Sequence, residues 1–210
     1  RDALNLIHES AREMPFSSNL VLQLHSIIYR YLPTEGGRWK ATDNEIVERS
    51  PDGEILRVRF RPVSAVETPQ AMESLSRRLH TAFEEGRQEP LVLVPLAILD
   101  FLCIHPFQDG NGRLSRALTT LLLLRAGYTY APYSSLERII EDSKDEYYKA
   151  LRRAQATLDK DDSQLIDWLT FFVRALGRQK DVLDRKVQKE RLMAPLPPLS
   201  EKLLGLAREH

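Results

Sequence analysis

The chain of 210 residues is 42% apolar and 29% charged, and its 30 basic residues balance its 30 acidic ones. This composition is typical of a globular protein that can bury a sizeable core. A net charge of zero excludes a broadly basic surface for nucleic acid or membrane, so any anion-binding site must be local.

The apolar residues predict a mainly helical chain. They recur at intervals of three and four residues, the period of a helix with one buried face, in residues 1–13, 19–32, 70–85, 114–126, 136–140, 144–157 and 164–191. A further helix ends at residue 104 and is apolar nearly all round, as expected of a central buried helix. It begins at Pro95, or it begins at Pro90 and kinks, because proline is favourable in a first turn.

Residues 44–60 depart from the helical pattern. Two stretches rich in β-formers flank Pro51-Asp52-Gly53, which is a turn signal, so the sequence predicts one β-hairpin. A lone hairpin leaves open edges. It is either a surface ribbon or a flap that pairs with an extended segment of a partner. The predicted fold class is therefore all-α with one small β-hairpin.

Three segments organise the chain in this interpretation. Residues 1–19 form an N-terminal helical segment, residues 20–192 form the main domain, and residues 193–210 form a proline-containing linker and the start of a truncated module. The single cysteine, Cys103, excludes an internal disulfide and fits a reducing compartment, which we take to be the cytoplasm. It lies in an apolar run, so we expect a buried, inert thiol. No apolar run reaches the ~20 residues of a membrane helix.

Residues 105–116 read His-Pro-Phe-Gln-Asp-Gly-Asn-Gly-Arg-Leu-Ser-Arg and lie between two apolar helical segments. A loop that only joins two core helices needs one or two turn residues. This stretch also holds a base, a carboxylate and two arginines, so we interpret it as a phosphate-handling active site. Phe107 is expected to anchor the loop in the core, and His25, beside an apolar helix face, is expected to be a satisfied core or surface histidine.

Each polar residue of this stretch suits phosphate chemistry. Gly110-Asn111-Gly112 leads directly into a helix, whose unpaired N–H groups and dipole bind anions. Arg113 and Arg116 are three residues apart and can grip a polyphosphate at two levels. A carboxylate such as Asp109 beside phosphate implies an intervening Mg²⁺. His105, with an ordinary pKa near ~6.5, can accept a proton at neutral pH.

The stretch resembles the signature of Fic domains, His-x-Phe-x-Asp/Glu-Gly-Asn-Gly-Arg-x-x-Arg, at every fixed position, and the resemblance extends over residues 20–176. It implies an enzyme that transfers AMP from ATP to a protein hydroxyl. His105 would deprotonate that hydroxyl, which attacks the α-phosphate and expels pyrophosphate, and Asp109 would hold Mg²⁺. The implied nucleotide-binding set is Asp109, Gly110, Asn111, Gly112, Arg113, Leu114, Ser115, Arg116, Tyr147, Tyr148, Gln155, Val47, Glu48, Arg49 and Ser50.

The resemblance also assigns parts within this set. Arg113 and Arg116 would bind the β- and γ-phosphates, and Tyr148 and Gln155 would lie at the adenine, where asparagine is more familiar than glutamine at the second position. Residues 47–50 would belong to a flap near the nucleotide, and the target protein would dock along residues 44–60. The turn of the flap is longer than usual in the family.

Regulation and further partners follow less directly from the resemblance. Many family members carry an inhibitory helix with a Ser/Thr-x-x-x-Glu-Gly/Asn motif, whose glutamate pairs with the second arginine of the signature. No such motif occurs near Arg1 or near His210. Either the chain lacks self-inhibition or, as we expect, the helix precedes Arg1. The segment after the linker resembles the start of a winged-helix module, through which DNA would bind. A homodimer is left open, and no membrane partner is expected.

Two further readings stay open. A close variant of the enzyme would transfer UMP or GMP, or would remove AMP. A reading from another class is a DNA-binding regulator in which this domain only senses a nucleotide; the presence of His105 argues against it, because a sensor needs no base.

Overall fold

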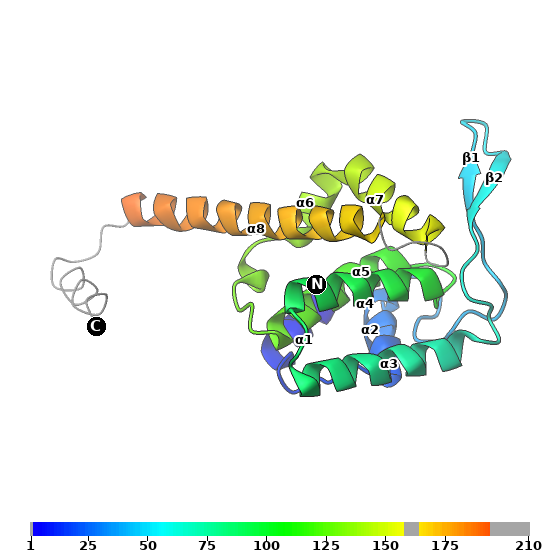
Figure 1. Ribbon diagram of the computed structural model, residues 1–210, viewed down its shortest axis with the longest axis horizontal. Coiled ribbons are helices and arrows are strands. Elements are labelled where there is room, and N and C mark those ends of the chain that lie inside the picture. Colours follow the sequence, from blue (N-terminus) through cyan, green and yellow to red (C-terminus); the bar gives the residue numbers. More distant parts are fainter. Residues whose placement is uncertain (1, 158–163, 194–210) are drawn as a thin grey trace.

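The computed structural model describes residues 2–157 and 164–193, which form a body of packed helices with one projecting hairpin (Figure 1). In chain order the elements are α1 (Asp2–Ser10), α2 (Ser18–Tyr29), β1 (Ile46–Arg49), β2 (Ile55–Phe60), α3 (Thr68–Glu85), α4 (Pro90–Ile104), α5 (Asn111–Arg125), a 3₁₀ turn η1 (Ala131–Tyr133), α6 (Leu136–Asp142), α7 (Lys144–Ala156) and α8 (Leu165–Met193). The predicted fold class, mainly helical with one small hairpin, is confirmed.

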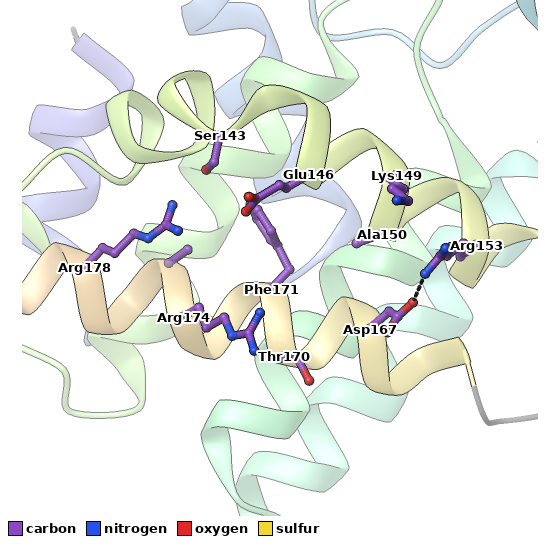
Figure 2. A pocket seen from close by; sticks show the side chains of 11 residues that line it. Ser143, Glu146, Lys149, Ala150, Arg153, Asp167, Thr170, Phe171, Arg174 and Arg178 are labelled. Atoms are coloured by element: carbon purple, nitrogen blue, oxygen red, sulfur yellow. Dashed lines mark hydrogen bonds and ion pairs between the residues drawn. The ribbon is translucent and has the colours of Figure 1, made fainter.

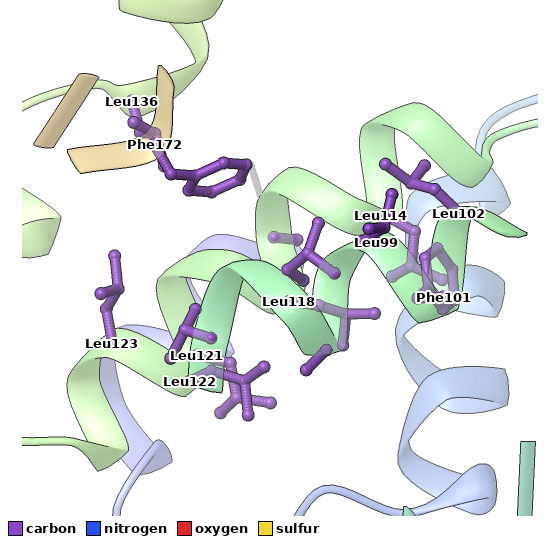
Figure 3. Close-up of a cluster of buried hydrophobic side chains, with 14 of the residues drawn as sticks. Leu99, Phe101, Leu102, Leu114, Leu118, Leu121, Leu122, Leu123, Leu136 and Phe172 are labelled. Atoms are coloured by element: carbon purple, nitrogen blue, oxygen red, sulfur yellow. The ribbon is translucent and has the colours of Figure 1, made fainter. Parts of the chain in front are cut away.

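The centre of the body is the pair α4 and α5. Helix α4 is apolar on most sides, and α5 is buried over most of its length. Leucines of both helices belong to one hydrophobic core with Phe172 of α8 and Leu136 of α6 (Figure 3). The helices α3, α7 and α8 pack on α4, and α1 packs on α5. The loop between α4 and α5 therefore starts and ends in the most rigid part of the molecule, which is what a site of fixed geometry needs.

The hairpin stands away from this body (Figure 1). Its strands pair antiparallel, with Ile46 opposite Phe60 and Arg49 opposite Ile55, and the register shifts twice. No other strand occurs among the described residues. The side chains of Ile55 and Leu56 are 57% and 62% exposed, so the hairpin keeps apolar surface and an unpaired edge in solvent.

Two helix boundaries matter for the site: the start of α4 is one of the two predicted alternatives, and the start of α5 differs from the predicted one. Helix α4 begins at Pro90 and contains Pro95 in its interior, which settles the alternative that the sequence left open. Helix α5 begins at Asn111, three residues earlier than predicted, because the Asn111 side chain bonds back to the preceding loop and stabilises the first turn. The glycines had suggested a turn there, since glycine is a poor helix former.

The expected segments have different outcomes. Helix α1 buries Ala3 and Ile7 in the common core, and the boundary expected between residues 19 and 20 lies within the first turn of α2. The linker and module expected at 193–210 lie almost wholly outside the described residues. Within the described residues, no helix has both the length and the apolar character required to cross a membrane.

The packing of α8 on α4 generates a stability prediction. Trp168 is fully buried, and its indole Nε1–H donates to the Pro95 carbonyl at 2.8 Å. Trp168→Ala should lower the free energy of unfolding by about 3–5 kcal/mol, because it leaves a cavity in the core. Chemical denaturation followed by circular dichroism measures this. Val173→Ala, at a position on the same helix that is 48% exposed, is the control and should change little; equal losses for both variants would contradict the assignment.

Candidate active site

The backbone of the loop between α4 and α5 is held by side chains from the segment that precedes the hairpin. Lys40 is buried, and its Nζ donates to Asn44 Oδ1 at 2.9 Å and to the Ile104 carbonyl at 3.2 Å. The Lys40 N–H donates to the Pro106 carbonyl, and Asn44 Nδ2 donates to the Phe107 carbonyl. These bonds satisfy loop carbonyls that no helix or strand could satisfy, and they fix the loop before any ligand binds.

Asn111 closes the loop from the other side. Its Oδ1 accepts the Phe107 N–H at 3.0 Å, and its Nδ2 donates to the Phe107 carbonyl at 2.7 Å. Phe107 is buried and stacks on the His25 ring, with centroids 3.7 Å apart. The prediction that Phe107 anchors the loop is confirmed. The Asn111 amide, expected at the phosphate, is engaged mainly in holding this loop.

His25 and Tyr29, on one face of α2, pack against Asp109 and Gly110 of the loop. His25 Nδ1 accepts the Gly37 N–H at 2.9 Å, so the proton must be on Nε2, which donates to the Asp109 carbonyl at 3.1 Å. The Tyr29 hydroxyl donates to Asp109 Oδ2 at 2.7 Å. Gly110 has φ +86°, and a Cβ there would lie 2.6 Å from Tyr29 Cε2, so only glycine fits this contact.

His25 was thus correctly predicted as a satisfied core histidine, but its contact with the loop was missed, and Tyr29 was not identified at all. Neither residue lies near residues 105–116 in the sequence. One signal was present: a histidine and a tyrosine four residues apart project from the same helix face, directly before the Gly36-Gly37 turn.

His105 has the environment of a neutral base. It follows the last residue of α4 with φ +51°, the left-handed conformation, and is the only described residue other than glycine with a positive φ. Its ring is half-buried, and Nδ1 is enclosed without a hydrogen bond of ordinary geometry. Burial above all, with a smaller effect of the Lys40 charge, lowers the His105 pKa to about 4, against the opposing effects of the Leu102 carbonyl and of Asp109. The imidazole is therefore uncharged at neutral pH and can accept a proton.

The N-terminus of α5 provides unpaired donors beside this base. The helix begins after Gly110, and no side chain caps it. The N–H groups of its first turn, at Asn111, Gly112 and Arg113, have no partner within the helix by geometry. Together with the dipole of a 15-residue helix, they make a cradle for an anion.

The two arginines leave this turn in different directions. Arg113 Nη2 donates to the Tyr29 hydroxyl at 2.9 Å and to Asp109 Oδ2 at 3.0 Å. Arg116 donates from Nε and Nη2 to Glu137 Oε1, at 3.1 and 2.8 Å. Neither arginine was expected to have an acidic partner within the fold. Arg116 lines the cavity that holds His105, whereas Arg113 lines a neighbouring cavity. Both would keep N–H donors for a phosphate.

A cavity of about 580 Å³ opens between the loop, the hairpin and α7. It is large enough for a nucleotide. The residues from the predicted set that line it are His105, Gly112, Arg116, Tyr147, Tyr148, Gln155 and Val47. The cavity also receives residues that the sequence did not single out, among them Ile46, Arg59, Asp145 and Arg152.

One polar group in this cavity, the Gln155 amide, has an unpaired donor. Gln155 is 9% exposed, and its Nε2 is buried without a hydrogen bond of ordinary geometry, although its amide lies near the Cys103 thiol. Such an unpaired donor costs free energy until a ligand satisfies it. Burial raises the pKa of Cys103 to about 12, so the thiol is inert, as predicted. Tyr147 packs against Trp168 and Phe171 as a wall, and Tyr148 is 46% exposed.

Other residues of the predicted set lie away from the cavity. Leu114 is fully buried in the core and its N–H is bonded to the Gly110 carbonyl, so it has no free group for a nucleotide. Ser115 is buried, and its hydroxyl donates to the Gly112 carbonyl. Glu48 is paired with Arg57 and Arg59 within the hairpin. Ser50 and Arg49 lie at the end of β1, toward the hairpin turn, where Ser50 bonds to Glu54.

The carboxylate of Asp109 fits a role as a single ligand of Mg²⁺. It is 78% exposed, and hydrogen bonds from Tyr29 and the Gly110 N–H, helped by Arg113, lower its pKa below the ordinary 3.8. It is therefore charged at neutral pH. No group of three or more potential metal ligands exists among the described residues, so an ion here would take its other ligands from phosphate and water.

A second, smaller hollow of about 200 Å³ lies between α7 and α8 (Figure 2). Lys149, Arg174 and Arg178 line it, and none of them forms an ion pair within the described chain, whereas Arg153 is paired with Asp167 at 2.6 Å. This hollow lacks a histidine. The larger cavity, with base, helix N-terminus and arginine together, is the candidate active site.

The sequence of this chain is similar to a known protein family and to several curated proteins. A model of the Fic/DOC family matches residues 15–123. A Fido domain-containing protein from Dictyostelium discoideum is 32% identical over 98 residues, which is 44% of this chain and 64% of that protein. A protein adenylyltransferase Fic from Drosophila grimshawi is 31% identical over 139 residues, 64% of this chain and 24% of that protein. The matches thus span less than two thirds of these relatives.

Solved structures share the fold. A Fic domain-containing signalling protein from Bacteroides thetaiotaomicron superposes with a TM-score of 0.67 at 23% identity, covering 84% of this chain and 67% of that one. A Fic family protein from Desulfovibrio desulfuricans gives a TM-score of 0.66 at 24% identity, covering 89% of this chain and 52% of that one.

The hydrogen bond from the Tyr29 hydroxyl to Asp109 leads to a prediction for Tyr29→Phe. The Tyr29 hydroxyl is the largest cause of the lowered Asp109 pKa. Its removal should raise that pKa toward 3.8, as measured by an NMR titration of the side-chain carboxyl. A lowered pKa stabilises the fold above the unfolded value and loses this contribution as pH falls through the folded value, so the acid limb of stability should move to higher pH.

Tyr31→Phe is the matched control. Tyr31 is 81% exposed and lies two residues after the end of α2, and its hydroxyl bonds to Asp2 rather than to the loop. An Asp109 pKa that stays unchanged in Tyr29→Phe would show that the hydroxyl does not hold the carboxylate.

Proposed function

Because the chain belongs to the Fic/DOC family, we propose that it is a protein adenylyltransferase, which transfers AMP from ATP to a hydroxyl side chain of another protein. The observation that carries this proposal is that a buried neutral histidine, an uncapped helix N-terminus and an arginine meet at one cavity of nucleotide size. The relatives named as adenylyltransferases support it.

The first step is proton removal by His105. A proton on Nδ1, favoured by the Leu102 carbonyl, leaves the lone pair on Nε2. The hydroxyl oxygen of the target gives its proton to Nε2 and forms a bond to the α-phosphorus of ATP. The bond between this phosphorus and the bridging oxygen breaks, and pyrophosphate leaves with the bonding pair. Burial keeps His105 uncharged near pH 7, so its lone pair is free to take the proton, while the lowered pKa makes the imidazole a weaker base than an exposed histidine.

The remaining groups neutralise charge. The first-turn N–H groups of α5 would bind the α-phosphate region, and Arg113 and Arg116 would bind the outer phosphates. Asp109 would hold Mg²⁺, which supplies further neutralisation when bound. The protein contributes positioning more than covalent chemistry, in keeping with the small needs of phosphoryl transfer.

Gln155 and Tyr148 would select the nucleobase. The unpaired Gln155 Nε2 can donate to a ring nitrogen or a carbonyl oxygen, and the half-exposed Tyr148 ring can stack on a base. A glutamine amide also suits uracil or guanine, so transfer of UMP or GMP is the variant that a competition assay with the four nucleotides should examine first.

The target would dock at the hairpin of residues 44–60. Its open edge and its exposed Ile55 and Leu56 suit an extended peptide that adds as a strand. Val47 lines the cavity, together with Glu45 and Ile46. The docked hydroxyl would therefore approach His105 past the base of the hairpin. The single inert thiol suits a reducing compartment supplied with ATP, which we take to be the cytoplasm.

The proposal predicts that label from α-³²P-ATP becomes covalently attached to protein in a lysate, and that His105→Ala reduces this by at least about a hundredfold, as loss of a general base does. His80→Ala, at an exposed position on α3, is the control and should retain activity. Label transfer that survives His105→Ala would contradict the mechanism. ATP binding with no transfer to any protein would favour the nucleotide-sensing regulator.

The lowered His105 pKa predicts an unusual pH profile. An ordinary histidine of pKa 6.5 becomes protonated as pH falls below 6.5, and its activity as a base is lost. With a pKa of about 4, His105 should stay neutral, and kcat/KM should be flat from pH 7.5 to about pH 5 before it falls. A profile that reaches half its maximum between about pH 6 and 7 would show that burial does not depress this pKa.

A further inference from the structure

Arg116 is held by an acidic residue that no sequence motif indicated. Glu137, in the first turn of α6, accepts from Arg116 Nε and Nη2 through the single oxygen Oε1, at 3.1 and 2.8 Å. Arg116 is 24% exposed and Glu137 is 59% exposed. Because Glu137 is so exposed, the ion pair contributes little to the stability of the fold. We therefore consider what the pair does for the orientation of Arg116.

The pair leaves one side of the guanidinium facing the cradle. Arg116 Nη1 lies 3.6 Å from the point that a Cβ on Gly112 would occupy. The nitrogen without a carboxylate partner is thus turned toward the first turn of α5, where the unpaired N–H groups lie. The edge that Glu137 occupies, Nε and Nη2, is the other one.

Glu137 approaches from outside the candidate active site. Arg116 separates two cavities: it lines the 580 Å³ cavity with His105, and it lines a neighbouring cavity of about 460 Å³. Glu137 lines only the second. Its carboxylate therefore does not occupy the space in which a nucleotide would meet His105.

The position of Glu137 is itself fixed by the core. Gln179 of α8 is fully buried and donates from Nε2 to the carbonyls of Ala131 and Ser134, at 3.1 and 2.5 Å. Ser135 then caps α6 by accepting the Arg138 N–H, and Leu136 is buried. The start of α6 is thus tied to α8, and an acidic residue in the first turn of a helix is favourable with the dipole.

We propose that Glu137 is a positioning residue, which holds Arg116 so that Nη1 faces the outer phosphates of a nucleoside triphosphate bound at the N-terminus of α5. This rests on the proposed function for the nucleotide itself. A free arginine side chain samples many rotamers, and ordering it costs binding free energy. Because Glu137 already orders the Arg116 side chain in the free protein, less ordering is needed when the ligand binds. The effect should be confined to ligands long enough to reach Arg116.

The test compares a triphosphate with a monophosphate. Binding of α,β-methylene-ATP, which cannot be cleaved between the α- and β-phosphates, and of AMP is measured by isothermal titration calorimetry with Mg²⁺ present. Glu137→Ala should weaken the triphosphate analogue about tenfold, the size of one charge-assisted hydrogen bond. The affinity for AMP should change less than about twofold. Glu137→Gln, which keeps an accepting oxygen, should lie between the wild type and Glu137→Ala.

Glu141→Gln is the matched control. Glu141 lies one turn further along α6 and pairs with Lys144 at 2.9 Å, but it does not contact Arg116. The Glu141→Gln variant should bind both nucleotides as the wild type does. Thermal unfolding of each variant verifies that the fold is kept.

Each contrary result has a distinct meaning. Tighter binding of the analogue to Glu137→Ala would mean that Glu137 competes with phosphate, and equal weakening of AMP and the analogue would mean a purely structural role. Unchanged binding of both would overturn the inference and leave the proposed function intact. A wild-type protein that binds neither nucleotide would overturn both.

Discussion

The site depends on hydrogen bonds that hold the backbone between α4 and α5 from outside the loop. Lys40 and Asn44 bond to its carbonyls, and the Asn111 amide makes a two-way bridge to Phe107. A loop of this kind cannot satisfy its own backbone groups, and leaving them buried and unpaired would be costly. The same bonds that stabilise the loop therefore also fix the left-handed turn at His105, and with it the direction of the imidazole. One set of contacts therefore both stabilises the loop and orients the proposed catalytic base.

Local charge at the site is uneven although the chain as a whole is neutral. Lys40, Arg113, Arg116 and the positive end of α5 lie around the loop, and two carboxylates of this region, Asp109 and Glu137, are each paired with an arginine. The buried cation at Lys40 and the dry environment keep His105 neutral. An anion is thus attracted without forcing a proton onto the base. Arginine–carboxylate pairs preserve this balance, because each leaves N–H donors of the guanidinium free.

Features determined by neighbouring residues could be predicted from the sequence, and features that depend on distant ones could not. The hairpin, the central helices and the anchoring role of Phe107 follow from local patterns. The beginning of α5 was placed too late, because glycine lowers helix propensity and the compensating bond from Asn111 is visible only in three dimensions. Tyr29, Lys40 and Glu137 come from other elements and carry no motif. Conversely, Leu114 and Ser115 belong to the sequence signature but are buried on the inner face of α5.

The Arg116–Glu137 pair changes how regulation of such a site should be considered. In the family that the chain resembles, an inhibitory glutamate pairs with the arginine at this position. Here one edge of that guanidinium already has a carboxylate partner from α6. A regulatory carboxylate would have to displace Glu137 or approach Nη1, the same nitrogen that faces the cradle. In the second case it would compete with the outer phosphate for a single donor. With one edge of Arg116 fixed within the fold, phosphate binding and an approach of such a carboxylate to the remaining edge would exclude each other.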